Sequence, residues 1–251
     1  MTTTDLTGTT AIVTGASRGF GRGIAGSLAG AGAHVVGVAR GEADLLAVHD
    51  QLGGSFTPVV ADAADPELAG KLLAEHHPTF VVLNAGTTPP PAPVQDQTWE
   101  TFSTTWDVDV QHVFHFVRAA LRSPLDPGSV VVSFSSGAAL RGSPLSGGYA
   151  GSKAAIRFLS AYAAGQSDQL DLGIRFVAAL PQLTPATELG ATYVDAYADL
   201  AGLTREQYLA GFDDLLTPTH VGDAILDLVS DDTRTALAYL MTPGGAAPVD
   251  G

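Results

Sequence analysis

Short apolar runs recur along the chain and are separated by stretches with helical spacing. Glycine, proline or polar residues bound each run, as is typical of strands that are covered on both faces. We interpret six runs as buried strands: residues 9–14, 34–39, 56–61, 80–83, 129–134 and 174–180. Strands that alternate with helices predict an α/β fold with a doubly wound parallel sheet.

Between the strands, apolar residues recur at the intervals of amphipathic helices. Helices are expected after residue 21, over residues 68–75 behind Asp65-Pro66-Glu67, over 99–121, and over about 150–165. The helix over 99–121 is expected to turn one apolar stripe towards the sheet, namely Val110, Val113, Phe114, Val117 and Leu121.

A glycine-rich loop follows the first strand. A helical pattern and the second strand come after it, so the segment matches a βαβ unit of about thirty residues. Glycines let the backbone approach a diphosphate, whose charge the amino end of the next helix stabilises. A glycine cluster alone also fits a plain turn, but the strand before it and the helix after it favour a nucleotide site. The candidate cofactor-binding residues of this loop are Gly15, Ser17, Arg18, Gly19, Phe20 and Gly21.

The end of the second strand indicates which nucleotide is bound. A carboxylate there would bind the adenosine ribose and repel a 2′-phosphate, but the strand ends in Ala39-Arg40. Arg40 and Arg18 together favour NADP(H) over NAD(H), because guanidinium groups pair well with phosphate. Glu42 lies close enough to weaken this interpretation, and two solvated arginines remain the alternative.

Further polar groups follow the third and fourth strands. Asp62 and Ala63 come directly after the third strand, where Asp62 is placed to bind an adenine, and Asn84-Ala85-Gly86 follows the fourth. Ligands bind parallel sheets at the carboxyl ends of the strands. We therefore expect these residues to line the same cofactor site as the glycine-rich loop.

Tyr149 and Lys153 are four residues apart, which places both side chains on one face of a helix. A nearby ammonium lowers the pKa of a phenol, so Tyr149 could exchange a proton near neutral pH. The alternative is an ordinary surface pair, but Lys71 is the only other lysine of the chain. Ser136 follows the fifth strand and could meet a substrate oxygen that the phenol also touches.

Composition narrows the class of protein. The chain has 251 residues, 45% of them hydrophobic, which is enough for a large core. A net charge of −14 argues against nucleic-acid or anionic-membrane partners, and no apolar run is long enough for a membrane span. There are no cysteines and no signal-peptide pattern, so we expect a cytoplasmic protein without a metal site.

The motifs resemble those of the short-chain dehydrogenase/reductase family in type, order and spacing, over nearly the whole chain. They are Thr14-Gly15-x-x-x-Gly19-x-Gly21, Asn84-Ala85-Gly86, and Ser136 with Tyr149-x-x-x-Lys153. The resemblance implies one Rossmann-type domain over residues 1–251, with about seven strands and a helical substrate lid over about 184–216.

The resemblance also implies hydride transfer between a nicotinamide and a carbonyl/alcohol pair on a small molecule. Tyr149 would be the acid/base, Ser136 would orient the substrate oxygen, and Lys153 would bind the nicotinamide ribose. The family pairs subunits through two long helices, so a homodimer or homotetramer is expected. The outer faces of these helices, over about 99–121 and 148–167, would be Phe116, Ala119, Ala154, Phe158 and Ala161.

Three departures from the family pattern stand out. Asp109 occupies the place of the family's asparagine, whose backbone carbonyl holds a water in the proton relay, so we include it among the candidate catalytic residues. After the sixth strand, Pro181 and Thr184 take the places of residues beside the nicotinamide, without the usual asparagine and glycine. Residues 236–241 lack the polar motif of many tetrameric members.

The lid sequence favours an apolar or aromatic substrate over a sugar. Its large apolar residues are Tyr193, Tyr197, Leu200, Leu203, Tyr208 and Phe212. An NADP(H)-dependent carbonyl reductase or alcohol dehydrogenase is therefore predicted. The alternative is an NADP(H)-binding regulatory or scaffold protein with little or no catalysis, because a fold does not by itself imply an activity.

Overall fold

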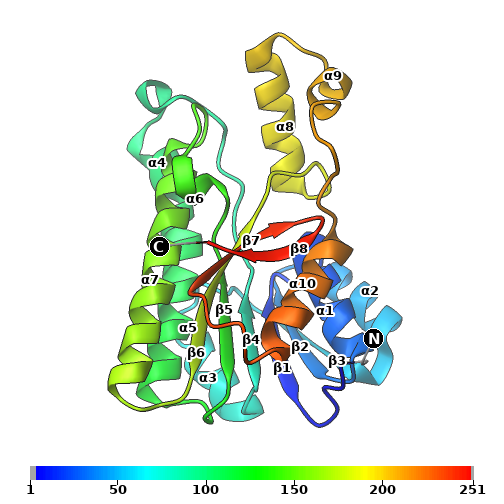
Figure 1. Cartoon of the computed structure of the whole chain (residues 1–251), viewed down its shortest axis with the longest axis vertical. Coiled ribbons are helices and arrows are strands. Elements are labelled where there is room, and N and C mark those ends of the chain that lie inside the picture. Colours follow the sequence, from blue (N-terminus) through cyan, green and yellow to red (C-terminus); the bar gives the residue numbers. More distant parts are fainter. Residues whose placement is uncertain (1–3, 250–251) are drawn as a thin grey trace.

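The computed structural model describes residues 4–249 as a sheet with helices on both faces (Figure 1). The strand order is β3-β2-β1-β4-β5-β6-β7-β8. The strands are β1 Thr10–Thr14, β2 His34–Ala39, β3 Phe56–Val60, β4 Phe80–Leu83, β5 Val130–Phe134, β6 Arg175–Pro181, β7 Ala238–Thr242 and β8 Gly245–Pro248. Neighbouring strands are parallel from β3 to β7, so the predicted doubly wound parallel sheet is confirmed.

Alternating strand residues build two separate cores, because successive side chains of a strand point to opposite faces. In β1, Ala11 and Val13 belong to one apolar cluster, whereas Ile12 belongs to the other. In β5, Val130 and Val131 divide in the same way. Strands that are buried on both faces read as continuous apolar runs, which is why they could be recognised in the sequence.

The helices cover the two faces in two groups. One cluster contains residues of α1, α2 and α10, and the other contains residues of α3, α5 and α7. Figure 1 shows α10, α1 and α2 on one side of the sheet and α7 and α5 on the other. The helices are α1 Gly19–Gly30, α2 Glu42–Leu52, α3 Leu68–His76, α4 Trp99–Thr105, α5 Gln111–Arg122, α6 Ala138–Arg141, α7 Gly147–Gln169, α8 Glu188–Ala201, α9 Arg205–Leu209 and α10 Pro218–Ser230.

The sheet has eight strands rather than about seven. The additional strand, β8, pairs antiparallel with β7 through a short turn over residues 242–245. Gly245 has φ +109°, a backbone conformation that glycine adopts readily. The apolar content of β8 is too low, and the strand too short, for the segment to read as a buried strand.

The predicted helix over 99–121 is interrupted, and this corrects the face assigned to two phenylalanines. A π-helical segment, Trp106–Val110, separates α4 from α5 and shifts the phase of the residues that follow. Phe116 is 1% exposed in the core, whereas Phe114, which was expected to face the sheet, is 47% exposed. The buried face of α5 is formed by His112, Val113, Phe116, Val117 and Ala120.

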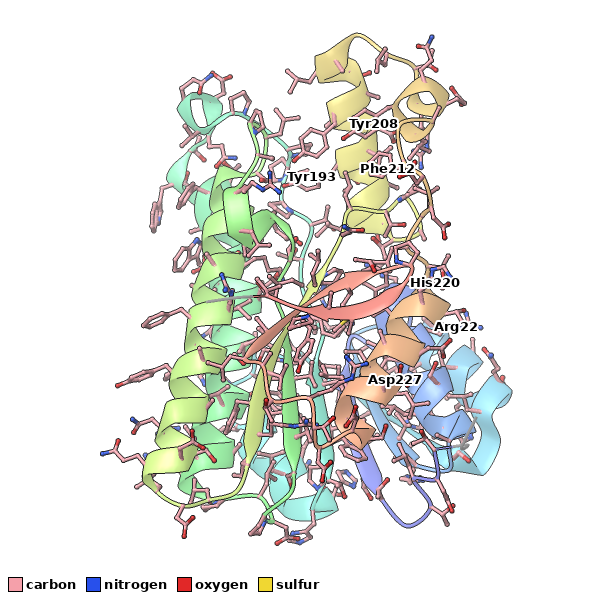
Figure 2. All side chains as sticks on the ribbon, in the orientation of Figure 1. Arg22, Tyr193, Tyr208, Phe212, His220 and Asp227 are labelled. Atoms are coloured by element: carbon pink, nitrogen blue, oxygen red, sulfur yellow. The ribbon has the colours of Figure 1, made fainter. Side chains whose placement is uncertain are left out.

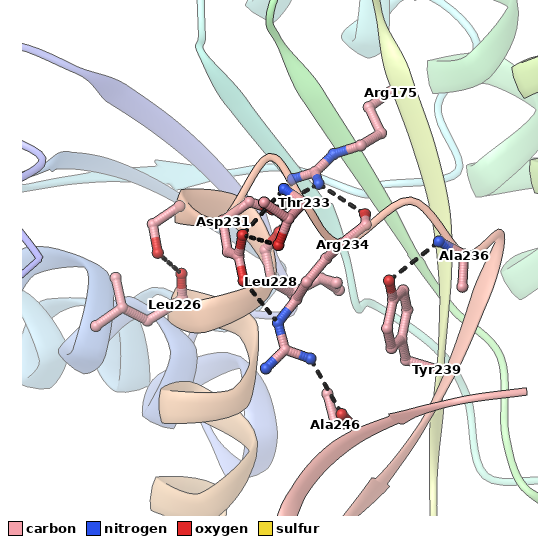
Figure 3. Close-up of polar contacts among 10 residues, drawn as sticks. Arg175, Leu226, Leu228, Asp231, Thr233, Arg234, Ala236, Tyr239 and Ala246 are labelled. Carbon is pink, nitrogen blue, oxygen red and sulfur yellow. Dashed lines mark hydrogen bonds and ion pairs between the residues drawn. The ribbon is translucent and has the colours of Figure 1, made fainter.

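Arg175, the first residue of β6, ties the sheet to the end of α10 (Figure 3). Its guanidinium donates hydrogen bonds to the backbone carbonyls of Leu228 at 2.6 Å, Asp231 at 2.9 Å and Arg234 at 2.9 Å. Carbonyls at a helix end lack partners within the helix. One side chain therefore satisfies three carbonyls at this end of α10 and in the turn that follows.

The predicted lid region contains two helices, α8 and α9, which project beyond the carboxyl edge of the sheet (Figure 1). Thr187 caps α8 by accepting a hydrogen bond from the Gly190 N–H, and Thr204 caps α9 in the same manner from Gln207. Within residues 4–249, no helix combines the length and apolarity that crossing a bilayer requires.

Candidate active site

A cavity of about 1130 Å³ opens at the carboxyl edge of the sheet and runs beneath α8. Every cofactor and catalytic residue proposed from the sequence lines it, except Gly21. The lining residues among those candidates are Gly15, Ser17, Arg18, Gly19, Phe20, Arg40, Asp62, Ala63, Asn84, Ala85, Gly86, Asp109, Ser136, Tyr149, Lys153, Pro181 and Thr184. The parallel strands thus bring together residues that are far apart in the sequence.

Hydrogen bonds between β1 and β4 fix the floor of the cavity. The hydroxyl of Thr14 accepts hydrogen bonds from the backbone N–H groups of Asn84 and Ala85, both at 3.0 Å. The Asn84 amide donates to the carbonyls of Thr14 and Gly15, at 3.1 and 3.3 Å. Gly15 has φ +66°, and a Cβ there would lie 2.8 Å from the Asn84 amide nitrogen, so only glycine fits this approach.

The amino end of α1 faces the cavity without a side-chain cap. Arg18 occupies the N-cap position, makes no side-chain cap hydrogen bond, and no acidic residue lies in the first turn. The free N–H groups of such a helix end bind anionic groups, and the helix dipole favours negative charge there. This end of α1 therefore fits the diphosphate of a dinucleotide.

Arg18 and Arg40 differ in their surroundings. The guanidinium of Arg18 forms an exposed ion pair with Glu188, the first residue of α8. Arg40 is exposed at the end of β2 and lines the cavity together with Asp44. Within residues 4–249, none of the ion pairs involves Arg40, so its guanidinium is the freer of the two to meet a phosphate.

Lys153 and Asp109 form a buried ion pair beside Tyr149. The Lys153 ammonium lies 2.9 Å from the Asp109 carboxylate and donates a hydrogen bond to the Phe134 carbonyl at 3.1 Å. The same carboxylate accepts a hydrogen bond from the Thr87 N–H at 2.9 Å. A Cβ at Gly86 would lie 2.8 Å from this carboxylate, so the glycine makes room for Asp109. Asp109 is thus paired rather than isolated.

Burial raises the pKa of Tyr149, and the Lys153 ammonium acts in the opposite direction, as the sequence predicted. A hydrogen-bonding interaction with Ser136 also lowers the pKa of Tyr149, whereas the negative charge of Asp109 raises it. The net pKa is above the usual value, which differs from the expected lowering because burial is the largest contribution. In this structure, Tyr149 is a neutral phenol near pH 7.

Opposing effects also set the pKa of Lys153. Burial lowers the pKa, but Asp109 and Tyr149 more than offset this effect, so the pKa of Lys153 is raised. The ammonium lies 5.6 Å from the centre of the Tyr149 ring. Lys153 therefore remains charged at neutral pH and stabilises the phenolate form of its neighbour.

Ser136 and Thr184 differ in how their hydroxyl groups are engaged. Ser136 Oγ accepts a hydrogen bond from the Ala138 N–H at 3.1 Å, and its hydroxyl also interacts with the Tyr149 hydroxyl inside the cavity, so both groups can meet one substrate oxygen. Thr184 is 2% exposed, donates to the Leu216 carbonyl at 2.5 Å and accepts from the Ala186 N–H. Thr187 also lines the cavity, and its hydroxyl accepts from the Gly190 N–H but donates no hydrogen bond among the described residues, so its proton is available to a ligand whereas that of Thr184 is not.

Among the lining residues that were not sequence candidates are the polar or charged residues Asp44, His112, Ser143 and Glu188. Asp44 lies in the first turn of α2 and Glu188 in the first turn of α8, and both helices follow predicted site residues in the sequence. Their position just after those residues could have identified them. His112 stands three residues after Asp109 on the buried face of its helix, and burial lowers its pKa to about 3. No pattern in the sequence distinguishes such a histidine from a core residue.

Comparisons with known proteins agree with this geometry. The family model described as short chain dehydrogenase matches residues 9–197. The L-xylulose reductase of Mesocricetus auratus is 31% identical over 98% of this chain and 96% of that protein. A Beutenbergia cavernae protein assigned as an NAD(P)-dependent gluconate 5-dehydrogenase, with bound NADP, has a TM-score of 0.80 at 28% identity, covering 96% of this chain and 98% of the other.

A 3-ketoacyl-(acyl-carrier-protein) reductase from Brucella melitensis, complexed with NADH, has a TM-score of 0.77 at 23% identity, over 95% of this chain and 99% of the other, and supports the fold alone. The family match covers most of the chain, and the cavity fits a nicotinamide dinucleotide. The chain belongs to the short-chain dehydrogenase family and is an oxidoreductase of the NAD(P)(H)-dependent kind.

Proposed function

We propose that this protein interconverts a ketone or aldehyde and the corresponding alcohol with NADP(H), using Tyr149 as the acid/base. The observation that carries the proposal is the buried arrangement of Tyr149, Lys153 and Asp109 within the cavity that also holds Ser136. A phenol next to a buried ammonium can give up a proton and still be stabilised as phenolate.

Each residue has a distinct part in this mechanism. The nicotinamide, when bound, supplies or accepts the hydride. Ser136, which interacts with the Tyr149 hydroxyl when no substrate is bound, donates its hydroxyl proton to the substrate oxygen and orients it. Tyr149 protonates the same oxygen during reduction and accepts the proton during oxidation. Lys153 holds its charge near the phenol and is itself fixed by Asp109 and the Phe134 carbonyl.

The cofactor would lie along the carboxyl edge of the sheet. The glycine-rich loop and the uncapped end of α1 would hold its diphosphate, while Asp62 lies at the adenine end. Asp62 already accepts a hydrogen bond from the Ala64 N–H, which fixes its carboxylate. Arg40 would bind the 2′-phosphate, and this residue underlies the preference for NADP(H).

The substrate would lie between Ser136, Tyr149 and the lid. Tyr193, Tyr197 and Tyr208 line this end of the cavity. Aromatic walls bind apolar or aromatic molecules through buried area and ring contacts. We therefore propose an apolar or aromatic carbonyl compound rather than a sugar as the substrate.

Replacing the proposed acid tests the chemistry. Tyr149→Phe should lower carbonyl turnover by roughly 10²–10⁴-fold, the usual contribution of a positioned acid. NADPH affinity, measured by fluorescence titration, should stay close to that of wild type. Tyr162→Phe is the matched control, since Tyr162 is 61% exposed on the outer face of α7. A Tyr149→Phe variant that kept most of its rate would identify another group as the acid.

Replacing Arg40 tests the cofactor. A charge-assisted hydrogen bond contributes roughly 1.5–3 kcal/mol, so wild type should bind NADPH at least about tenfold more tightly than NADH. Arg40→Ala should remove most of this preference by weakening NADPH binding alone. Equal dissociation constants of the two cofactors in wild type would contradict the assignment, as would an unchanged preference in Arg40→Ala.

A second function, cofactor binding with little or no catalysis, is favoured by one observation. Asp109 balances the charge of Lys153 and, with burial, keeps the pKa of Tyr149 high, which weakens the phenol as an acid. The two functions are separated by titrating NADPH and then surveying carbonyl compounds for turnover. Tight binding without turnover of any compound would support a regulatory protein.

A further inference from the structure

A continuous row of aromatic rings extends from Tyr149 into the lid. Tyr193 lies 5.8 Å from Tyr149 between ring centroids, Tyr197 lies 6.0 Å from Tyr193, and Tyr208 lies 6.3 Å from Tyr197. Phe212 completes the row at 5.6 Å from Tyr208. Figure 2 places Tyr193, Tyr208 and Phe212 around α8 and α9, above the carboxyl edge of the sheet. All the rings except Phe212 line the cavity.

Four of the five rings in this row belong to tyrosines, and they carry hydroxyl groups where phenylalanine would supply the same apolar surface. Tyr197 uses its hydroxyl within the protein, in a hydrogen bond with Ser143. Ser143 in turn pairs with the Ser146 hydroxyl at 2.7 Å. This contact joins α8 to the loop in front of Tyr149. It gives the hydroxyl group of Tyr197 a structural role, which leaves the hydroxyl groups of Tyr193 and Tyr208 to be explained.

The hydroxyl of Tyr193 has no such partner. Tyr193 is only 3% exposed and lines the cavity, yet none of the hydrogen bonds among residues 4–249 uses its hydroxyl. The side chain is largely buried, but its hydroxyl oxygen is open to the cavity, so water or a ligand there has to supply its hydrogen bonds. The cavity is the one place from which a partner for this hydroxyl can come.

The protonation state of Tyr193 defines what it can bind. Burial raises its pKa, and the neighbouring phenols Tyr149 and Tyr197 raise it further, so the group is a neutral donor at all ordinary pH values. A neutral phenol donates one hydrogen bond to an oxygen and accepts another from a hydroxyl. It therefore suits a hydroxyl or carbonyl oxygen of a neutral ligand.

We propose that Tyr193 binds a second oxygen of the substrate, so that the preferred substrates are ring ketones bearing a further hydroxyl or carbonyl group. This inference rests on the proposed function, because it places the reacting carbonyl at Tyr149 and Ser136. The ring of the substrate lies against the row of phenols, and its second oxygen meets the Tyr193 hydroxyl. A binding site of this kind discriminates strongly, since a substrate without the oxygen leaves the phenol unpaired.

Matched ketones test the proposal. The probes are 1-tetralone and its 5-, 6- and 7-hydroxy derivatives, with NADPH as reductant. We expect kcat/KM for the best hydroxytetralone to exceed that for 1-tetralone by about tenfold, the value of one well-placed hydrogen bond. Tyr193→Phe should remove this advantage and leave 1-tetralone within about twofold of its wild-type value. Tyr162→Phe should change neither ratio.

A binding measurement separates this proposal from the catalytic one. Dissociation constants of the same ketones are measured calorimetrically with NADPH and the Tyr149→Phe variant, in which turnover plays no part. The best hydroxytetralone should bind more tightly than 1-tetralone, and adding Tyr193→Phe should abolish the difference. Equal affinities, no binding of any probe, or an equal loss for both ketones on Tyr193→Phe would overturn the inference. If the wild-type protein turned over none of the ketones but the affinity difference between the hydroxytetralone and 1-tetralone remained, the proposed reaction would be overturned instead.

Discussion

The negative charge of Asp109 partly cancels the effect of the Lys153 charge on the pKa of Tyr149. The side chain of Lys153 is 7% exposed and that of Asp109 is 2% exposed, so solvent screens the interaction between the two charges little. Removing one partner of a buried pair often costs about 3–5 kcal/mol, because the other charge is left uncompensated. Asparagine would keep a polar oxygen near both Lys153 and the Thr87 N–H, so it is the milder replacement.

We predict that Asp109→Asn shifts the pH profile of alcohol oxidation to lower pH. In the proposed mechanism, oxidation needs the phenolate of Tyr149, and the negative charge of Asp109 raises the pKa of that group. Without the charge, the phenolate forms at lower pH, so the rising limb of the profile moves in that direction. Reduction of a carbonyl should stay within about tenfold of wild type or increase, a change below about 1.4 kcal/mol in the barrier.

The measurement is the rate of alcohol oxidation at saturating cofactor over a range of pH, for wild type and Asp109→Asn. A shift to higher pH would show that Lys153 loses its own proton once Asp109 is neutralised. A hundredfold loss of rate with intact cofactor affinity would show that the carboxylate takes part in the chemistry.

Some properties of individual site residues could be predicted from the sequence and others could not. The spacing of Tyr149 and Lys153 was sufficient to place them together, because helix geometry is local. The net direction of the Tyr149 pKa was wrong, because burial depends on the lid and the sheet together. The pairing of Arg18 with Glu188 could not be predicted either, since it joins segments that are about 170 residues apart.

At the scale of elements, the junction of β6 with α10 depends on one guanidinium. Arginine holds three carbonyls because its donors form a rigid planar fork. Lysine has a single ammonium and cannot reach three separated carbonyls. We predict that Arg175→Lys lowers the free energy of unfolding by about 2–3 kcal/mol, and Tm by about 5–10 °C.

Thermal unfolding followed by circular dichroism would measure this change. Arg122→Lys, at the exposed end of α5, makes the same chemical replacement and should leave Tm unchanged. A Tm for Arg175→Lys equal to that of wild type would mean that water replaces the lost hydrogen bonds without penalty.

The elements themselves were predictable to different degrees. Strands β1 to β6 carry continuous apolar runs, and their alternation with helices predicted that they are parallel, although it does not fix the order in which they pair. The π-helical segment Trp106–Val110 was missed because no proline or glycine marks it, and Phe114, which was expected in the core, is exposed on the helix that follows it. Strand β8 was missed because its Gly-Ala-Ala-Pro sequence has low strand propensity and is held by pairing with β7.

At the scale of the whole molecule, the outer face of α7 presents an aromatic pair to solvent. The rings of Phe158 and Tyr162 stack with centroids 6.1 Å apart, and the residues are 73% and 61% exposed. Phe114 on α5 is also exposed. Exposed apolar groups of this kind mark surfaces where protein subunits meet.

We predict that the chain forms a homo-oligomer through this face and that Phe158→Glu weakens the assembly, because it would bury a carboxylate without a partner. Light scattering at micromolar concentration should give the mass of two or four chains for wild type and a lower mass for the variant. Leu46→Glu, on α2 with a leucine 45% exposed, is the control and should not change the mass. A monomeric wild-type protein would contradict the prediction.

The residues that line the cavity come from the carboxyl edge of the sheet, from the loops and helices next to that edge, and from the lid above it. Among the described residues, the opposite edge contributes none, and its connections include Pro127-Gly128 and the turn over residues 170–173. Protein engineering can use this separation directly. A fluorescent tag, a surface linker or a new pair of chain ends placed in the turn over 170–173 would stand a full strand length away from the chemistry, so attachment and catalysis can be altered independently in one molecule.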